Sequence, residues 1–507
     1  MSTAFADALK KEVDGEKTES ENGAVMYRTS SNKLVDCNFA LSSFRQKTED
    51  EIVKAFSDAY YENKEYALRW LFMARDVREG SGERRTFRVL LKWLATVDPA
   101  LAGRLVPAAA EYGRFDDLFC LLGTGAEDAV FSLVKERLEK DLAAAKEGRP
   151  ASLLAKWLKS PNTSSAASRA VAKKTYRALG MTEKEYRKAL SALRSYLDVV
   201  EVKMSAGRWG EIEYGRVPSK ANLAYAGAFM KNDQARRARY LESLKKGEAK
   251  INAGACFPSD IAYQYMKAGL FGGPAQHLES MWKALPDMGG EAGVITVVDV
   301  SGSMTWTTCD PASGIRPIDV ALALGVYCSE RLVGPFKDKA ITFSARPEYV
   351  DMSGAGTLYE KLGILQRSAV AMNTDVKAVM DLLLRTAKNA GLRQEDVPAV
   401  AILSDMEFDA GCGRPGEALF DEIAREWKEA GYSLPKIYFW NLGSRTGGIP
   451  IQFNENGVGL VSGYSQNTVR MLLSGRLDPW GILKEQLDAP RYARISEIAG
   501  GLADAAA

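Results

Sequence analysis

The sequence predicts a two-part chain, with an N-terminal α-helical repeat region followed by a C-terminal doubly wound α/β domain. Apolar residues recur at three- and four-residue spacing from about residue 47 to 285, which is typical of helices. A glycine-rich stretch, PDMGGEAG, then precedes short β-branched runs that alternate with helical segments. The predicted parts are a polar, disordered tail at 1–25, the helical region at 26–285, a linker at 286–293 and the α/β domain at 294–507.

The helical half is predicted from its periodicity and its helix starts. Ile52, Phe56 and Tyr60 follow one another at four-residue intervals, so they share one face of a helix. Thr48 with Glu51, and Thr182 with Glu185, have the spacing of capping boxes at helix N-termini. Many helices of about 10–20 residues joined by short turns indicate a helical-repeat array. The sequence has no clean fixed-period repeat, so any repeats are degenerate.

The C-terminal half is predicted from its continuous apolar strands. GVITVVDV, AVAILSD and PKIYFWNL are strand-length runs without polar alternation, which is typical of strands covered on both faces, and KAITFSARPEYV is predicted as a strand with a continuation. Between them lie the helical stretches PIDVALALGVYCSERL, TDVKAVMDLLLRTAKNAG and LFDEIAREWKEAG. Alternation of this kind predicts a largely parallel sheet with helices on both faces.

Polar oxygen donors follow the ends of two of these strands. Asp299, Ser301 and Ser303 come directly after the first strand, Asp405 ends a later one, and Thr374 stands just before a helix. In open α/β folds, ligands bind beyond the carboxyl ends of the strands. Carboxylate and hydroxyl oxygens suit a hard cation, so we expect these five residues to hold one Mg²⁺, with Mn²⁺ or Ca²⁺ as alternatives.

Composition excludes several kinds of chemistry. The chain has one histidine, His277, which rules out a multi-histidine metal centre and argues against a Ser-His-Asp triad. Its six cysteines are scattered and form no CxxC pair, so neither a zinc site nor a disulfide framework is expected. No apolar run approaches a membrane span, and the first residues lack a secretory signal. A reducing compartment follows, either the cytoplasm or a virus-like particle assembled there.

The charge is unevenly distributed along the chain. Residues 151–250 contain 21 basic and 9 acidic residues, whereas 291–507 contain 21 basic and 27 acidic residues. A basic region interleaved with aromatic residues indicates binding to a polyanion such as RNA. A set of cations on solvated helix faces would give the same composition. The candidate RNA contacts are Lys156, Arg169, Lys173, Lys174, Arg177, Arg187, Lys188, Arg194, Lys203, Arg208 and Lys220.

The strand-end motif resembles a known binding site. Asp299-Val300-Ser301-Gly302-Ser303, then Thr374, then Asp405, is similar to the metal-ion-dependent adhesion site (MIDAS) of von Willebrand factor A (vWA) domains. In such domains an acidic group of a partner typically completes the coordination of the cation. The resemblance therefore implies a binding site and no hydrolytic function.

A second resemblance concerns the helical half. The segments RDVREGSGERRTFRVLLKWL, YGRFDDLFCLL, AKWLKS, EYRKALSALRSYLDVVE and VPSKAN resemble uncharacterised proteins that join a helical region to a vWA domain. Their layout is similar to that of the TROVE-domain Ro autoantigens, in which HEAT-like helical repeats form a ring closed by a vWA domain. That likeness implies binding of small structured RNAs and of single-stranded 3′ ends of misfolded RNAs.

We therefore expect a non-enzymatic, Ro-like RNA-binding protein, because no base, nucleophile or phosphate loop assembles in the sequence. Two alternatives remain open. One is a protein-interaction scaffold whose metal grips an acidic residue of a partner protein, and the other is a structural component of a phage or virus-like particle. The turn GSGER at 80–84 is either an anion-binding nest or a structural turn between helices.

Overall fold

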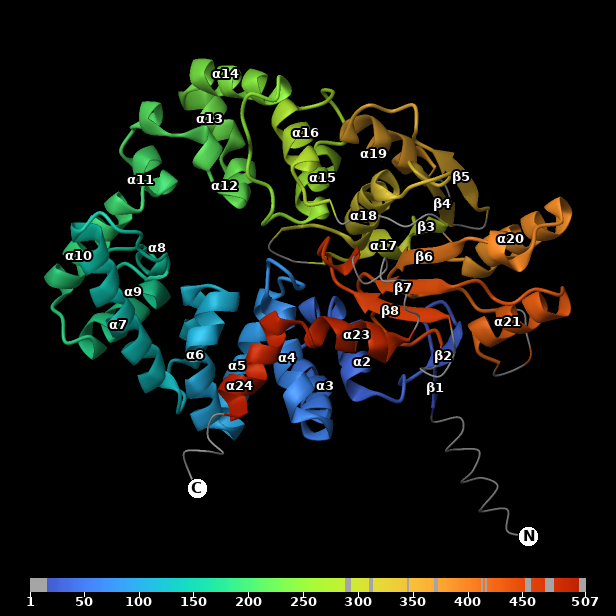
Figure 1. Cartoon of the computed structure of the whole chain (residues 1–507), viewed down its shortest axis with the longest axis horizontal. Coiled ribbons are helices and arrows are strands. Elements are labelled where there is room, and N and C mark those ends of the chain that lie inside the picture. The colour runs from blue at the N-terminus through green and yellow to red at the C-terminus, as the bar shows by residue number, and fades with distance from the viewer. Residues whose placement is uncertain are drawn as a thin grey trace, which may run out of the picture. The chain divides into compact units, whose positions relative to one another are not determined.

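The computed structural model describes residues 16–287, 293–309, 313–343, 346–368, 373–411, 414, 417–451, 457–469 and 478–500. Figure 1 shows helices along the N-terminal half and a sheet in the C-terminal half, as the sequence predicts. Every described secondary-structure element between residues 47 and 285 is a helix. The chain divides into two compact units, each discontinuous in sequence. Unit 1 comprises 1–67, 78–81 and 253–489, and unit 2 comprises 68–77, 82–252 and 490–507.

Unit 1 is built on a six-stranded mixed sheet in the order β5-β4-β3-β6-β7-β8. All neighbouring pairs are parallel except β4 and β5, which are antiparallel. The strand order runs in opposite directions on the two sides of β3, so the carboxyl ends of β3 and β6 lie at the switch point where open α/β folds bind ligands. The strands are β3 (Val294–Asp299), β4 (Lys339–Phe343), β5 (Glu348–Asp351), β6 (Ala399–Ser404), β7 (Ile437–Asn441) and β8 (Val458–Ser462).

Helix α18 (Pro317–Arg331) packs against β3, β4 and β6 and is buried from Pro317 to Ser329. Gly325 allows this close packing, because a Cβ atom there would lie 2.7 Å from Cγ2 of Val298. The other helices that follow β3 are α17 (Ser303–Trp306), α19 (Leu358–Arg367), α20 (Val376–Ala390), α21 (Leu419–Glu429) and α23 (Pro479–Leu487). Helices α15 (Pro258–Lys267) and α16 (Gln276–Lys283) pack against α19, so they belong to the same unit.

The N-terminal segment of unit 1 differs from the expected disordered tail. Strands β1 (Lys17–Glu19) and β2 (Val25–Tyr27) form an antiparallel hairpin, while residues 1–15 lie outside the described range. The backbones of Tyr27 and Ile449 pair as an antiparallel bridge, so the hairpin is held by residues far along the chain. Helices α2 (Lys33–Phe39) and α3 (Glu49–Glu62) follow, and α2 packs on β8.

Unit 2 contains only helices among its described elements. Both predicted capping boxes are present, at Thr48 in unit 1 and at Thr182 in unit 2. Arg75 and Asp117, both buried, form an ion pair at 2.7 Å that joins α4 to η2. The helices of this unit are the greater part of α4 (Lys64–Arg75), α5 (Arg84–Val97), α6 (Pro99–Tyr112), η2 (Phe115–Leu121), α7 (Glu127–Lys146), α8 (Leu154–Trp157), α9 (Ala166–Ala178), α10 (Glu183–Tyr196), α11 (Val200–Ser205), η3 (Trp209–Glu211), η4 (Tyr214–Arg216), α12 (Ser219–Ala224), α13 (Ala226–Asn232), α14 (Gln234–Lys245) and α24 (Pro490–Gly500).

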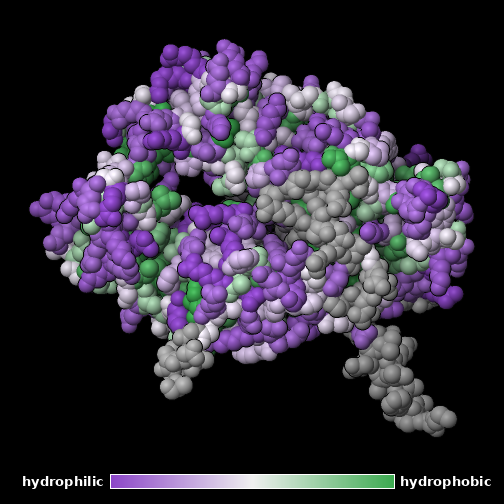
Figure 2. Space-filling view, viewed as in Figure 1, coloured by the Kyte–Doolittle hydropathy of each residue, from purple (hydrophilic) through white to green (hydrophobic). Residues whose placement is uncertain are grey.

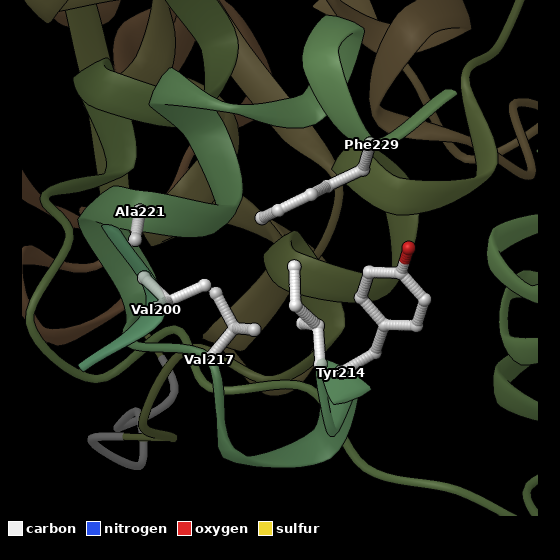
Figure 3. Packing of buried hydrophobic residues seen from close by; sticks show 6 residues of the cluster. Val200, Tyr214, Val217, Ala221 and Phe229 are labelled. Atoms are coloured by element: carbon white, nitrogen blue, oxygen red, sulfur yellow. The ribbon is translucent and has the colours of Figure 1, made fainter. Parts of the chain in front are cut away.

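A small apolar cluster holds the last helices of this region together. Figure 3 shows the Phe229 side chain pointing toward the side of Val200, Val217 and Ala221, and the Tyr214 ring packs edge-on against Phe229 with 5.3 Å between the ring centroids. The Arg237 guanidinium is buried here and lies 4.9 Å from the centre of the Tyr214 ring. A cation facing aromatic rings recovers part of its lost hydration energy, which allows a buried arginine in this cluster. The cluster comprises Val200, Ile212, Tyr214, Val217, Ala221 and Phe229.

The unit boundaries refine the domains predicted from sequence. The predicted linker at 286–293 lies partly outside the described residues, which resume at residue 293. Helices α2, α3, α15 and α16 belong with the sheet, and α24 belongs with the helical unit. Within the described residues, no helix combines the length and apolar character needed to cross a membrane.

Candidate metal centre and basic surface

Strand β3 delivers Asp299 to the carboxyl edge of the sheet. Its carboxylate is fully buried and accepts hydrogen bonds from the Ser301 N–H at 2.9 Å and from the Ser404 hydroxyl at 2.5 Å. Burial raises the pKa of Asp299, and the neighbouring charge of Asp405 raises it further. Two hydrogen-bond donors therefore hold the Asp299 carboxylate in a fixed orientation. Burying its negative charge away from water costs free energy.

The adjacent strand β6 brings Asp405 to the same edge. Val298 is in register with Leu403, so Asp299 and Asp405 lie at neighbouring strand ends. Asp405 is also fully buried, and burial raises its pKa against the lowering effect of the Arg445 guanidinium. The structure thus places the two predicted carboxylates at the ends of adjacent strands.

The two serines of the motif converge beside these carboxylates. The hydroxyl oxygens of Ser301 and Ser303 lie 3.0 Å apart, and the Ser303 hydroxyl also hydrogen bonds to Asp405. Both serines are buried. Helix α17 begins at Ser303, so the sharp change from strand to helix turns both hydroxyls to one side of the loop.

Thr374 is placed differently from the other four predicted ligands. It is buried just before α20, and its N–H donates to Asp409 at 3.1 Å. Its hydroxyl accepts from the Asn22 amide at 3.2 Å. Among the described residues, no hydrogen bond joins Thr374 to Asp299, Ser301, Ser303 or Asp405. Its link to them runs through the segment 405–409, whose Asp409 N–H donates to the Thr374 carbonyl at 3.0 Å.

Two further charged residues, which the sequence did not indicate, lie beside Asp405. Arg445, after β7, places Nη1 3.1 Å from an Asp405 oxygen. Glu407 is fully buried and accepts backbone hydrogen bonds from Arg445 at 2.7 Å and Thr446 at 3.0 Å. Both residues follow predicted strand ends, but nothing in their spacing marks them as neighbours of Asp405.

The donor set consists only of oxygen atoms. Among the residues that the structure describes, no three histidine, cysteine, aspartate or glutamate side chains lie together in a way that could hold a metal ion. The available donors are two buried carboxylates and the hydroxyls of Ser301 and Ser303, with Thr374 held nearby. Such a set fits a hard divalent cation, because Mg²⁺ and Mn²⁺ take oxygen ligands and retain water in open positions.

Several of the predicted RNA contacts instead have structural partners. The Arg194 guanidinium donates to the carbonyls of Ala155 at 2.8 Å and Leu158 at 2.7 Å and to the Ser160 hydroxyl at 2.7 Å. Lys203 is buried and pairs with Asp198. Further candidates with described partners in unit 2 are Lys156 with Glu201, Arg169 with the Thr163 and Ser164 carbonyls, Lys174 with Glu127, and Arg208 with Glu211.

A second group of cations is exposed. Lys184, Arg187 and Lys188 lie on one face of α10, and among the described residues no ion pair engages them. The opposite face of the helix buries Tyr186, Leu190 and Leu193. Lys173 and Arg177 on α9 are likewise exposed, and Lys220 lies at the start of α12. In the view of Figure 1, the surface over α7–α10 is predominantly hydrophilic (Figure 2).

The exposed face of α10 borders a pocket of about 720 Å³. Five cationic side chains line it, of which Arg194 and Arg208 already have partners in unit 2, and no carboxylate is among its described lining residues. The lining residues are Ser160, Pro161, Asn162, Lys184, Arg187, Lys188, Leu190, Ser191, Arg194, Ser195, Val202 and Arg208. A concave surface with cations only attracts anions more strongly than the same charges on a flat surface.

The interleaved aromatic residues and the GSGER turn have structural contacts. The Arg114 guanidinium lies 3.8 Å above the Trp157 ring, and the buried Tyr186 donates to the Lys159 carbonyl. In the turn, the Asn467 amide donates to the carbonyls of Arg78 at 3.1 Å and Gly80 at 2.9 Å. The N–H groups of Gly82 and Glu83 donate to the carbonyls of Asp76 and Ala74, so they are not available to an anion, which supports the structural interpretation over the anion nest.

Comparison with known proteins places both halves of the chain among families without an assigned function. A domain of unknown function, DUF7788, matches residues 293–485, which contain the whole sheet and the candidate metal centre. The chain is similar to uncharacterized protein L728 of Acanthamoeba polyphaga mimivirus, with 28% identity over 511 residues, 92% of this chain and 86% of the viral protein. The model of a second domain of unknown function, DUF2828, matches residues 20–152 and 150–293, more than half of the chain. The chain therefore belongs to the DUF2828 family.

Proposed function

We propose that the protein is a non-enzymatic RNA-binding protein whose helical unit holds the phosphate backbone. The observation that supports this proposal is the cation-lined pocket beside α10. Lys184, Arg187 and Lys188 line it from one helix face, and they are available to a ligand because they hold no described ion pair. Phosphate groups of a nucleic acid would supply the anions that its wall lacks.

RNA is favoured over other polyanions by the resemblance of the layout to Ro proteins. We also propose that the helices are HEAT-like repeats and that the sheet domain is of the vWA type. Because the aromatic residues of the region make structural contacts, binding is expected to depend on charge more than on stacking. Phosphate contacts carry little sequence information, so affinity should vary little with RNA sequence.

The test is a charge-reversal series on the full chain. The triple variant Lys184→Glu/Arg187→Glu/Lys188→Glu should bind a fluorescent single-stranded RNA at least about tenfold more weakly at 0.1 M salt. The matched control, Lys231→Glu/Lys245→Glu/Lys246→Glu, makes the same change in net charge on α13 and at the C-terminal end of α14, outside the pocket. Equal losses in both variants would mean that the pocket is not the binding site.

We also infer that unit 1 binds one divalent cation through Asp299, Ser301, Ser303, Thr374 and Asp405. The observation that supports this is the convergence of two buried carboxylates with two hydroxyls beyond the carboxyl ends of the adjacent strands β3 and β6. A bound Mg²⁺ or Mn²⁺ would supply positive charge and open coordination positions for an acidic group. The residues of the chain would bind and orient the cation, and we expect the site to serve binding and not hydrolysis.

Calorimetry with Mn²⁺ tests the cation site directly. The wild-type chain should bind one Mn²⁺, and Asp299→Ala should abolish binding without loss of secondary structure. Asp381→Ala is the matched control, because Asp381 is an α20 carboxylate paired with Lys377 on a solvated face. Unchanged Mn²⁺ binding in Asp299→Ala would refute the site.

A further inference from the structure

Arginine side chains gather where α4, α5 and η2 meet in unit 2. The Arg75 guanidinium pairs with the buried Asp117 at 2.7 Å, and Nε of Arg88 lies 2.6 Å from the same carboxylate. Asp116 pairs with Arg88 at 3.0 Å and with Arg114 at 2.7 Å. The two carboxylates of η2 therefore already serve three guanidinium groups.

Arg84 adds a fourth guanidinium to this cluster. It is the first residue of α5, one turn before Arg88 on the same helix face, and its side chain is exposed. Burial of part of the side chain and the positive charges of the other three arginines lower the pKa of Arg84 to about 10, against the opposing effect of Asp117. Within the part of the chain that the structure describes, no ion pair or hydrogen bond engages the Arg84 guanidinium. The cluster thus has more positive than negative charge.

Lys92 continues the basic face of α5. Arg84, Arg88 and Lys92 follow one another at four-residue intervals, so they lie on one side of the helix. Burial raises the pKa of the Cys120 thiol in η2 to about 12, while the positive charges of Arg88 and Lys92 lower it, so this side of α5 faces η2. Lys92 is exposed, and none of the ion pairs among the described residues includes it.

The cluster lies close to the α10 pocket. The Arg114 guanidinium lies 3.8 Å above the ring of Trp157, which ends α8. Ser160, three residues further along the chain, lines the pocket. Three residues of extended chain span at most about 11 Å. Between the two sites, Nζ of Lys159 lies 5.7 Å from the centre of the Phe119 ring in η2. A few nucleotides of single strand would cover this distance.

We propose that the arginine cluster of α5 and η2 is a second RNA contact, at which Arg84 and Lys92 bind phosphates of the strand that occupies the α10 pocket. Guanidinium groups match phosphate oxygens in geometry and charge. Consecutive phosphates suit cations that extend along a helix face, whereas one carboxylate would match only part of them. The inference rests on the proposed RNA function and gives the strand a path from α10 across residues 157–160 to α5. None of the RNA contacts predicted from the sequence lies in this cluster.

The experiment measures binding of a fluorescent uridine RNA of about 12 nucleotides to the full chain at about 0.15 M salt. Arg84→Glu/Lys92→Glu should weaken binding by about tenfold and lower the magnitude of the salt slope by about 1.4, the contribution of two single-strand phosphates. The matched control, Arg239→Glu/Lys245→Glu, makes the same change in net charge at exposed positions of α14. It should bind within about twofold of the wild type, because salt screens distant charges.

Thermal melting without RNA supplies a second readout. The Arg84→Glu/Lys92→Glu variant should melt at or above the temperature of the wild type, because it relieves repulsion among like charges. A lower melting temperature would show that Arg84 serves the fold and would overturn the assignment. If this variant binds RNA like the wild type while the Lys184→Glu/Arg187→Glu/Lys188→Glu variant binds weakly, this inference fails alone. If the wild type binds no RNA, the proposed function fails and the inference fails with it.

Discussion

At the scale of single residues, Arg194 shows how a basic side chain can serve the fold. The sequence places it with Arg187 on one helix, seven residues apart, which suits a shared track of phosphates. In the structure only Arg187 is exposed, while the Arg194 guanidinium is occupied by the carbonyls and hydroxyl of residues 155–160. Composition cannot separate these roles, because both depend on what a distant segment offers to the guanidinium.

Replacing Arg194 should therefore affect stability before binding. Arg194→Gln leaves the carbonyls of Ala155 and Leu158 without their donor, which should cost about 2 kcal/mol of unfolding free energy. Arg187→Gln should stay within about 0.5 kcal/mol of the wild type, as exposed substitutions usually do. Urea denaturation measures both values. A stable Arg194→Gln variant that binds RNA weakly would return Arg194 to the binding surface.

The candidate metal centre was also predictable only in part at this scale. Asp299, Ser301, Ser303 and Asp405 could be grouped from sequence, because parallel strands end at one edge of a sheet. Asn22, Glu407 and Arg445 could not be found in this way. Their positions depend on loops and on a hairpin whose partners lie about 390 residues away, and no local pattern encodes such pairings.

At the scale of elements, helix α10 combines a structural and a binding face. The buried residues Tyr186, Leu190 and Leu193 alternate with the exposed Lys184, Arg187 and Lys188, as a helix of 3.6 residues per turn requires. Periodicity predicted this helix and its Thr182–Glu185 capping box correctly. It did not predict the hairpin at residues 17–27, because strands of three residues depend on tertiary contacts for their stability.

If the exposed face of α10 holds phosphates, affinity should respond to salt in a defined way. Log affinity should fall linearly with log salt, with a slope of about −0.7 for each single-strand phosphate neutralised. The Lys184→Glu/Arg187→Glu/Lys188→Glu variant should lower the magnitude of that slope by about 2. Fluorescence anisotropy between 50 mM and 200 mM salt measures it. A slope that stays the same would show that these cations do not contact phosphate.

At the scale of the whole molecule, the compact units do not follow the order of the sequence. Helix α24 belongs to unit 2, where the Arg491 side chain pairs with the buried Asp76 and the Tyr112 hydroxyl reaches the Arg491 carbonyl. Tyr492 and Ile495 are buried in the same unit. The predicted domain boundaries, 294–507, therefore include a helix that packs in the other unit. Sequence patterns predict secondary-structure elements but not their packing partners.

Truncation after residue 489 should thus destabilise unit 2 and leave the sheet intact. Removal of α24 exposes the sites of Tyr492 and Ile495 and leaves Asp76 without Arg491, so the loss should reach several kcal/mol. Hydrogen exchange should show faster exchange in α4 and α6 and unchanged protection in β3, β6 and β7. Uniform loss of protection over both units would indicate a single cooperative unit instead.

The long-range contacts of the N-terminal hairpin have a consequence for biosynthesis. Its partners at 407–410 and 445–449 leave the ribosome long after residues 17–27, at about 5–20 residues per second, so the hairpin waits on the order of 20–80 s without them. Throughout that time its strands present unpaired edges to other nascent chains. Docking of the hairpin on these later segments is therefore a late event, and chaperones that shield short unpaired strands should raise the yield of native protein.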